Sequence, residues 1–113
     1  MRFRSLLLVA CLLAASLSGA EESETMSDRT FRNITERQRD LFADAAKQGD
    51  QLNESTFKSQ VQVLIHDYEV FLRDHPKHAA GFAAYGYLLG KVGMRKEAAA
   101  ILLKANQLDP NLA

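Results

Sequence analysis

The chain has 113 residues, 47% of them hydrophobic, and its 14 basic side chains balance its 14 acidic ones. This length allows one small domain, and the charge balance argues against a nucleic-acid-binding protein, which normally carries a basic surface. Cys11 is the only cysteine, so a chain that begins after it can form no disulfide and no thiolate metal site.

The first 20 residues have the three parts of a secretory signal peptide. Arg2 and Arg4 give a basic start, an uncharged apolar run follows, and small residues precede a cleavage point after Ala20. The apolar run is shorter than the about 20 residues of a membrane-spanning helix. We therefore expect residues 1–20 to be removed on export to a bacterial periplasm or the cell exterior, with no membrane span in the mature chain.

Residues 8–11, LVAC, also resemble the lipidation motif of bacterial lipoproteins, with Cys11 as the lipidated residue. That alternative would leave little apolar core before Cys11 and a second apolar segment at the start of the mature chain. We favour Cys11 as an ordinary residue of the signal. Cleavage after Ala20 removes Arg2 and Arg4 and leaves twelve basic against fourteen acidic side chains, so no nucleic-acid partner is expected.

Two helices are predicted in the first half of the mature chain, after a flexible polar leader at 21–29. The first helix starts at about residue 30, repeats apolar residues every three to four positions, and ends near Gly49. The second starts near Ser55 or Thr56. It ends before Pro76, because proline disfavours the helical conformation of the preceding residue.

Two further helices are predicted at about 79–91 and 96–108. Gly93 lies in the turn between them, and Asp109-Pro110 ends the second. No segment alternates apolar and polar residues as a half-buried strand does. The predicted fold class is therefore all-α, with about four helices forming two antiparallel hairpins in series.

Residues 79–112 resemble a tetratricopeptide repeat. Pro76 and Pro110 lie 34 positions apart, which is the period of that repeat, and both follow a predicted helix. Tyr85 stands where the repeat has leucine and Leu89 where it has an aromatic residue, but both are apolar. The matching structural positions are Phe82, Tyr85, Gly86, Leu89, Gly93, Ala98, Leu102, Ala105 and Pro110.

The resemblance implies an α-solenoid in which the two helices of a hairpin cross closely. It implies that Gly86 makes room for Ala98, while Leu102 helps to fill the hairpin interior. The resemblance does not explain Gly81 and Gly90, which would either form a shallow surface or have no specific role. The hairpin at 30–75 matches the repeat only in apolar character, so we interpret it as a divergent or capping hairpin before the repeat at 76–113.

The residues indicate no enzyme, cofactor or metal site. His75 and His78 flank Pro76, but only Asp74 stands nearby as a further ligand, fewer than a metal centre needs. Asp40 and Asp44 lie one turn apart on an arginine-rich helix, which is typical of a solvated face.

The resemblance implies a protein-interaction module that binds a peptide or partner helix along the first helix of the repeat. A floor of small residues with one aromatic ring suits an apolar side chain or a helix. Equally, the alanines would allow tight packing between helices. The matching positions are Ala80, Ala83, Ala84, Tyr87 and Lys91. The alternative is that the chain is the N-terminal part of a larger secreted repeat protein, with a catalytic or anchoring domain downstream.

The helix at 96–108 has a further implication. In a tetratricopeptide array this helix also stacks on the next repeat, and arrays usually need about three repeats. Without that neighbour, apolar surface at Ile101 or Leu108 and a small patch at Ala105 should face water. We therefore expect marginal stability or self-association through this helix.

Overall fold

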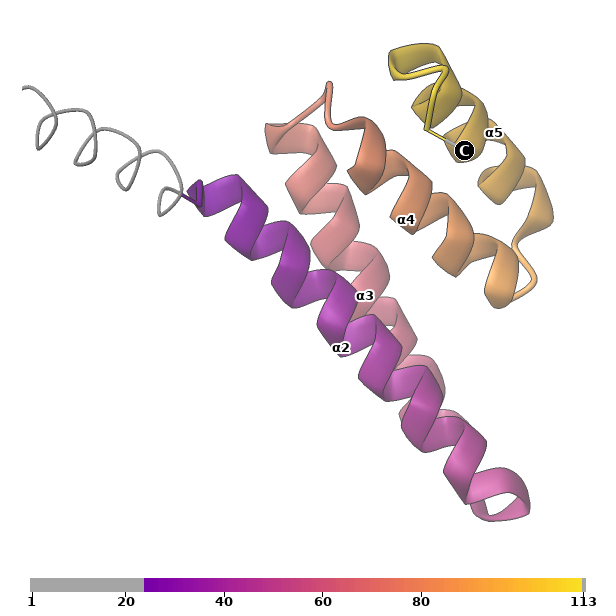
Figure 1. The fold of residues 1–113 in the computed structure, drawn as a ribbon. Coiled ribbons are helices and arrows are strands. Elements are labelled where there is room, and N and C mark those ends of the chain that lie inside the picture. The colour runs from indigo at the N-terminus through magenta and orange to yellow at the C-terminus, as the bar shows by residue number, and fades with distance from the viewer. Residues whose placement is uncertain (1–23, 113) are drawn as a thin grey trace, which may run out of the picture.

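The computed structural model describes residues 24–112, and these residues form four α-helices and one short 3-10 helix, without a strand. The helices α2 and α3 run antiparallel as one hairpin, and α4 and α5 form a second hairpin beside it (Figure 1). The predicted all-α class is confirmed; the signal peptide lies outside the described residues. The elements are α2 (Met26–Gln48), η1 (Gly49–Gln51), α3 (Glu54–Asp74), α4 (Ala79–Lys91) and α5 (Arg95–Leu108).

The helix α2 begins earlier than the predicted leader at 21–29 allows. Thr25 is its N-cap: the Thr25 hydroxyl accepts a hydrogen bond from the Asp28 N–H at 3.1 Å, and the Asp28 carboxylate accepts one from the Thr25 N–H at 3.4 Å. Such a capping box satisfies backbone donors that the first turn would otherwise leave free. Arg32 adds an ion pair with Glu24 at 2.6 Å. The leader prediction is thus wrong for residues 26–29.

The turns between the helices follow local signals. Gly49 closes α2 with φ of 50°, and Gly93 joins α4 to α5 with φ of 87°, a backbone region that glycine enters without a side-chain clash. Asn53 caps α3 by accepting a hydrogen bond from the Thr56 N–H at 3.1 Å. The helix α3 ends at Asp74, two residues before Pro76, as predicted.

The hydrophobic core lies where the two hairpins meet. Tyr68 of α3 and Leu88 of α4 are fully buried, and the Tyr68 ring stacks on the Tyr85 ring with centroids 5.4 Å apart. The Tyr68 hydroxyl donates a hydrogen bond of 2.6 Å to Oε1 of the buried Gln38 on α2. One buried cluster therefore joins α2, α3, α4 and α5: Ile34, Leu64, Tyr68, Phe71, Leu72, Tyr85, Leu88, Leu89 and Ala98.

The close approach of α4 and α5 differs in detail from the prediction. A Cβ atom built on Gly86 would lie 2.7 Å from both Cγ and Cδ2 of Leu102. Ala98 instead faces Gly90, whose added Cβ would lie 3.7 Å from the Ala98 Cβ. The prediction named the wrong partner because antiparallel helices pair residue 86 with 102 and residue 90 with 98.

Gly81, which the repeat pattern left unexplained, lies at another close approach. A Cβ at Gly81 would lie 2.8 Å from Nδ1 of His78, 2.9 Å from Cδ2 of Leu72 and 3.2 Å from Cε1 of Phe71. Gly81 therefore lets the start of α4 pack closely on the end of α3. Among the other positions of the predicted repeat, Tyr85, Leu89, Ala98 and Ala105 are buried, Phe82 is half-buried, and Pro110 follows the end of α5.

His78 is the N-cap of α4. Its Nδ1 accepts a hydrogen bond from the Gly81 N–H at 2.8 Å, so the ring proton is on Nε2. The ring packs edge-on against Phe31 and Phe71, with centroids 4.8 and 5.0 Å away. The residue therefore joins α2, α3 and α4 at one end of the core.

Replacing His78 with alanine should lower the free energy of unfolding by about 1–2 kcal/mol, because a helix N-terminus loses its cap. His78→Asn should recover part of the lost stability, since asparagine is a favoured N-cap. Urea unfolding followed by circular dichroism measures both variants. If His78→Asn were no more stable than His78→Ala, the cap would contribute nothing and ring packing alone would account for the loss.

Candidate functional site

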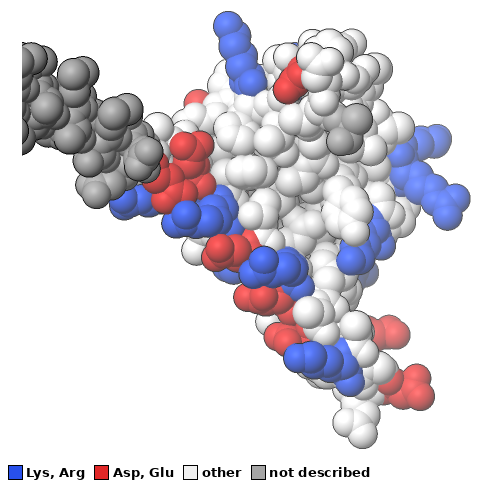
Figure 2. All heavy atoms as spheres, in the orientation of Figure 1, with Lys and Arg blue, Asp and Glu red and all other residues white. Residues whose placement is uncertain are grey.

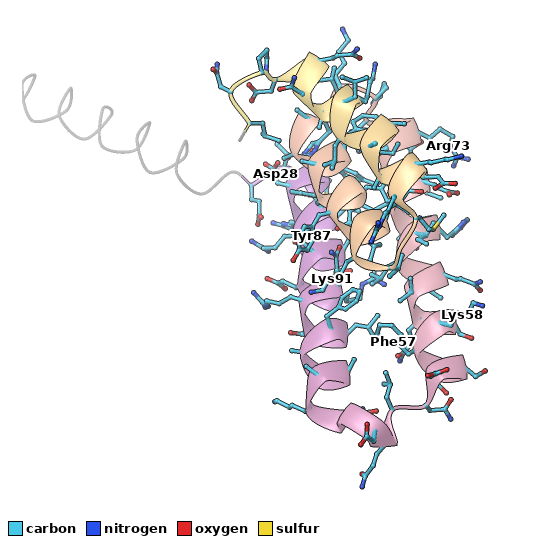
Figure 3. The ribbon with its side chains drawn as sticks, turned by 90° about the vertical axis from the view of Figure 1, so that its right-hand side faces the viewer. Asp28, Phe57, Lys58, Arg73, Tyr87 and Lys91 are labelled. Carbon is cyan, nitrogen blue, oxygen red and sulfur yellow. The ribbon has the colours of Figure 1, made fainter. Side chains whose placement is uncertain are left out.

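The five residues that the sequence predicted to bind a partner lie along α4 but differ in exposure. Ala80, Ala83 and Ala84 are half-buried, whereas Tyr87 is 61% exposed and Lys91 is also exposed. Figure 3 shows Tyr87 and Lys91 on the part of α4 that looks toward α2. We call this the Tyr87–Lys91 surface, made of Tyr87, Lys91 and Phe42 of α2.

The ammonium group of Lys91 defines the chemistry of the Tyr87–Lys91 surface. Its Nζ lies 4.4 Å from the centroid of the Phe42 ring and 5.6 Å from that of Tyr87, within the range of cation–π attraction. In the part of the chain that the structure describes, Lys91 forms no salt bridge. An exposed aromatic ring beside a cation suits a ligand that carries apolar and acidic groups together.

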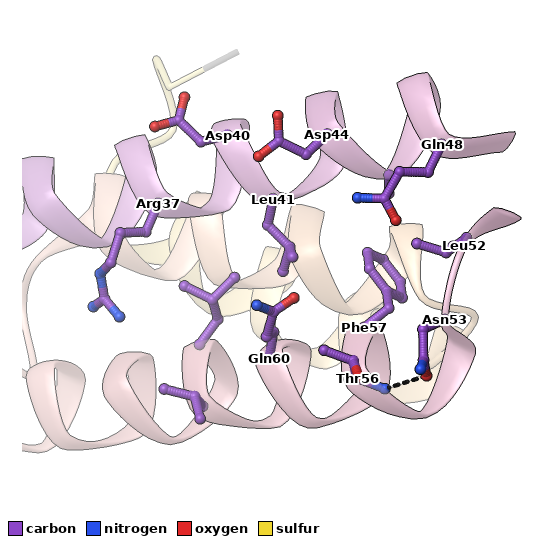
Figure 4. Close-up of a pocket in the computed structure, with 13 residues that line it drawn as sticks. Arg37, Asp40, Leu41, Asp44, Gln48, Leu52, Asn53, Thr56, Phe57 and Gln60 are labelled. Carbon is purple, nitrogen blue, oxygen red and sulfur yellow. Dashed lines mark hydrogen bonds between the residues drawn. The ribbon is translucent and has the colours of Figure 1, made fainter.

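A hollow that the sequence did not predict lies between α2 and α3. This hairpin groove has a volume of about 500 Å³. Figure 4 shows Leu41 and Phe57 inside it, with Asp40 and Asp44 on the α2 side. Its lining residues are Arg37, Asp40, Leu41, Asp44, Ala45, Gln48, Leu52, Asn53, Thr56, Phe57, Gln60, Val63 and Leu64.

The hairpin groove is partly apolar and has a polar rim. Phe57 packs edge-on against Phe42, with ring centroids 5.4 Å apart. At the other end, Arg37 joins α2 to α3 through a 2.7 Å ion pair between its Nη2 and Oδ2 of Asp67. Asp40 and Asp44 are exposed, as the prediction of a solvated face requires. Sequence periodicity missed the groove because a hollow depends on how far apart two helices stand.

Charge is distributed unevenly over the molecule. In Figure 2, acidic and basic side chains alternate along α2, whereas the visible surface over α4 and α5 is largely uncharged. Residues 24–112 contain no cluster of three or more His, Cys, Asp and Glu side chains suited to a metal ion. Within the same residues, no helix has both the length and the apolar character needed to cross a bilayer.

The exposed apolar surface of α5 is not where the sequence placed it. Ala105 is buried, and Ile101 and Leu108 are half-buried. The exposed side chains are Leu102 and Leu103, which are 44% and 57% exposed. The prediction of uncovered apolar surface on this helix holds, but its residues differ because α5 is rotated to place Ala98 and Ala105 against α4.

The surroundings of Tyr68 and Tyr85 raise the pKa values of these two buried tyrosines. Burial raises the pKa of Tyr68 to about 12, and the positive charge of Arg37 acts in the opposite direction. Burial, the negative charge of Glu69 and a hydrogen bond of 3.3 Å to its carboxylate raise the pKa of Tyr85 to about 12. Both hydroxyls therefore hold their protons more tightly in the folded chain.

The protein should lose stability in alkaline solution. The folded state raises the pKa values of Tyr68 and Tyr85 from 10.0 to about 12. The protonated hydroxyls therefore add to the free energy of unfolding in full below about pH 10, and this stabilisation disappears as the pH rises to about 12. Tyr85→Phe should unfold with a weaker pH dependence over this range. Urea unfolding at a series of pH values measures the effect. An unchanged pH dependence in Tyr85→Phe would contradict this role for Tyr85.

Comparison with known proteins found no match to this chain among family models, curated proteins or solved structures.

Proposed function

We propose that this chain is an exported interaction module of the tetratricopeptide type, which binds a peptide or helix of another protein at the Tyr87–Lys91 surface. Two features support the repeat assignment. Pro76 and Pro110 follow the ends of α3 and α5 at the repeat period. Gly86 lies against Leu102 where α4 and α5 approach closely.

The exposure of Tyr87 is the observation that carries the binding proposal. The ring is 61% exposed and lies beside Lys91, so its apolar face is open to a ligand. Tyrosine is enriched at the centre of protein interfaces, where its ring supplies contact area and its hydroxyl a hydrogen bond. The ligand that fits is an extended or helical segment with an apolar side chain for Tyr87 and an acidic one for Lys91.

Site-specific photo-crosslinking tests the proposal. A photoreactive residue in place of Tyr87 should capture one discrete partner in the organism's own cells, whereas the same residue in place of Arg73, exposed on α3, should not. The variant Lys91→Glu should weaken capture at position 87. A third variant carries the photoreactive residue in place of Gln60, in the hairpin groove. If only this variant captured a partner, the Tyr87–Lys91 surface would not be the binding site.

Export forms a separate part of the proposal and is supported by the tripartite pattern of residues 1–20. N-terminal sequencing of the exported product should begin at Glu21. A lipid-modified Cys11 at the N-terminus, or a soluble cytoplasmic protein that retains Met1, would contradict it.

A further inference from the structure

The outward face of α5 carries a continuous row of exposed side chains. Within the described residues α5 packs only against α4, so the sides of α5 that turn away from α4 are uncovered. Leu102 stands at the border of this surface, because its side chain contacts Gly86 of α4 and is still 44% exposed. Ala99, Leu102, Leu103 and Asn106 follow the spacing of one helix face, and all four are exposed. We call this row the α5 seam. It gathers two of the large apolar side chains that the folded chain leaves in water.

The ends of the α5 seam carry opposite charges. Lys96 lies three positions before Ala99 on α5. Asp109 lies three positions after Asn106, is the C-cap residue just beyond α5, and is half-buried. Its Oδ1 accepts a hydrogen bond of 3.0 Å from the Asn111 N–H. Neither Lys96 nor Asp109 forms a salt bridge within residues 24–112. A second helix that runs antiparallel along the seam would therefore meet a cation at one end and a carboxylate at the other.

We propose that two copies of this chain associate through their α5 seams, antiparallel, about a twofold axis between Leu102 and Leu103. This axis places Leu102 of one copy against Leu103 of the other and Ala99 opposite Asn106. It also sets Lys96 opposite Asp109 at both ends, so that the seam is complementary to itself, as a twofold interface requires. A parallel pair would instead bring the two Lys96 side chains together.

The expected association is weak. The helix α5 has 14 residues, which at 1.5 Å per residue makes it about 21 Å long. A contact of that length buries less than the about 1,200 Å² of a standard stable interface. We therefore expect a weak dimer, because a small contact leaves little binding free energy after the cost of association is subtracted. The Tyr87–Lys91 surface lies toward α2, so each copy of the dimer would still present it.

Sedimentation velocity of the chain from Glu21, measured at concentrations up to about 1 mM, tests this proposal without any partner. Leu103→Glu should shift the dissociation constant at least about tenfold, because it buries a charge at the axis. Val63→Glu on α3 is the matched control, since Val63 is 54% exposed and Leu103 57%. A chain that stays monomeric at every concentration, or equal effects of both variants, would overturn the proposal.

A charge exchange tests the antiparallel arrangement. Lys96→Glu alone and Asp109→Lys alone each place like charges opposite one another and should weaken dimerisation. The double variant restores opposite charges and should recover most of the wild-type affinity. Failure of the double variant to recover, with helix content unchanged by circular dichroism, would exclude this register. Because no partner protein is present, these results are independent of crosslinking at position 87.

Discussion

Replacement of Tyr68 by alanine should lower the free energy of unfolding by about 3–5 kcal/mol, the usual cost of deleting a buried aromatic side chain. Tyr68 is fully buried and stacks on Tyr85. Its removal leaves a cavity at the junction of the two hairpins. It also removes the hydroxyl group that donates a hydrogen bond to Oε1 of the buried Gln38. For a domain of this size, such a loss approaches the total stability. Urea unfolding followed by circular dichroism measures it.

Two controls separate the contributions of the Tyr68 ring and hydroxyl. Tyr68→Phe keeps the ring and should cost about 1–3 kcal/mol, because Oε1 of Gln38 is then buried without its partner. Tyr87→Ala removes an exposed ring and should cost less than about 1 kcal/mol. If Tyr68→Ala were no more destabilising than Tyr87→Ala, the core would not depend on this contact between α2, α3 and α4.

Gly86→Leu should destabilise the protein by about 1–3 kcal/mol or more, because it overfills the contact between α4 and α5. A Cβ at this position already lies 2.7 Å from Leu102 Cδ2 and 3.3 Å from the Leu102 backbone nitrogen. The Leu102 side chain is partly exposed and can rotate away, but the backbone nitrogen cannot. The expected result is a lower melting temperature.

Gly90 is the matched control for this close approach. Gly90→Ala meets only the Ala98 Cβ, at 3.7 Å, which is an ordinary contact. It should be neutral or stabilise by up to about 1 kcal/mol, because alanine favours the helix more than glycine. Leu102→Ala combined with Gly86→Ala should recover stability relative to the sum of the single variants. Equal melting temperatures for Gly86→Leu and Gly90→Ala would show that the helices are not in contact at Gly86.

Local sequence signals predicted most helix ends. Pro76 stops α3 through a clash with the preceding residue, and Gly93 permits the turn between α4 and α5. The start of α2 was missed, although Thr25 and Asp28 have the spacing of a capping box and could have indicated it. The groove positions on α4 remain a prediction, since exposure at Tyr87 and Lys91 does not identify what binds there.

The sequence by itself determined the all-α class, the pairing of helices into hairpins and the apolar face of each helix, because these depend on neighbours within a few residues. Only the tertiary structure decided the axial register and rotation of the helices. That register sets Gly86 against Leu102 and leaves Leu103 in water while Ala105 is buried. It also brings Gln38 to the Tyr68 hydroxyl across 30 residues. Helical periodicity specifies which side is apolar, but side-chain packing between helices selects the contacts that this side makes.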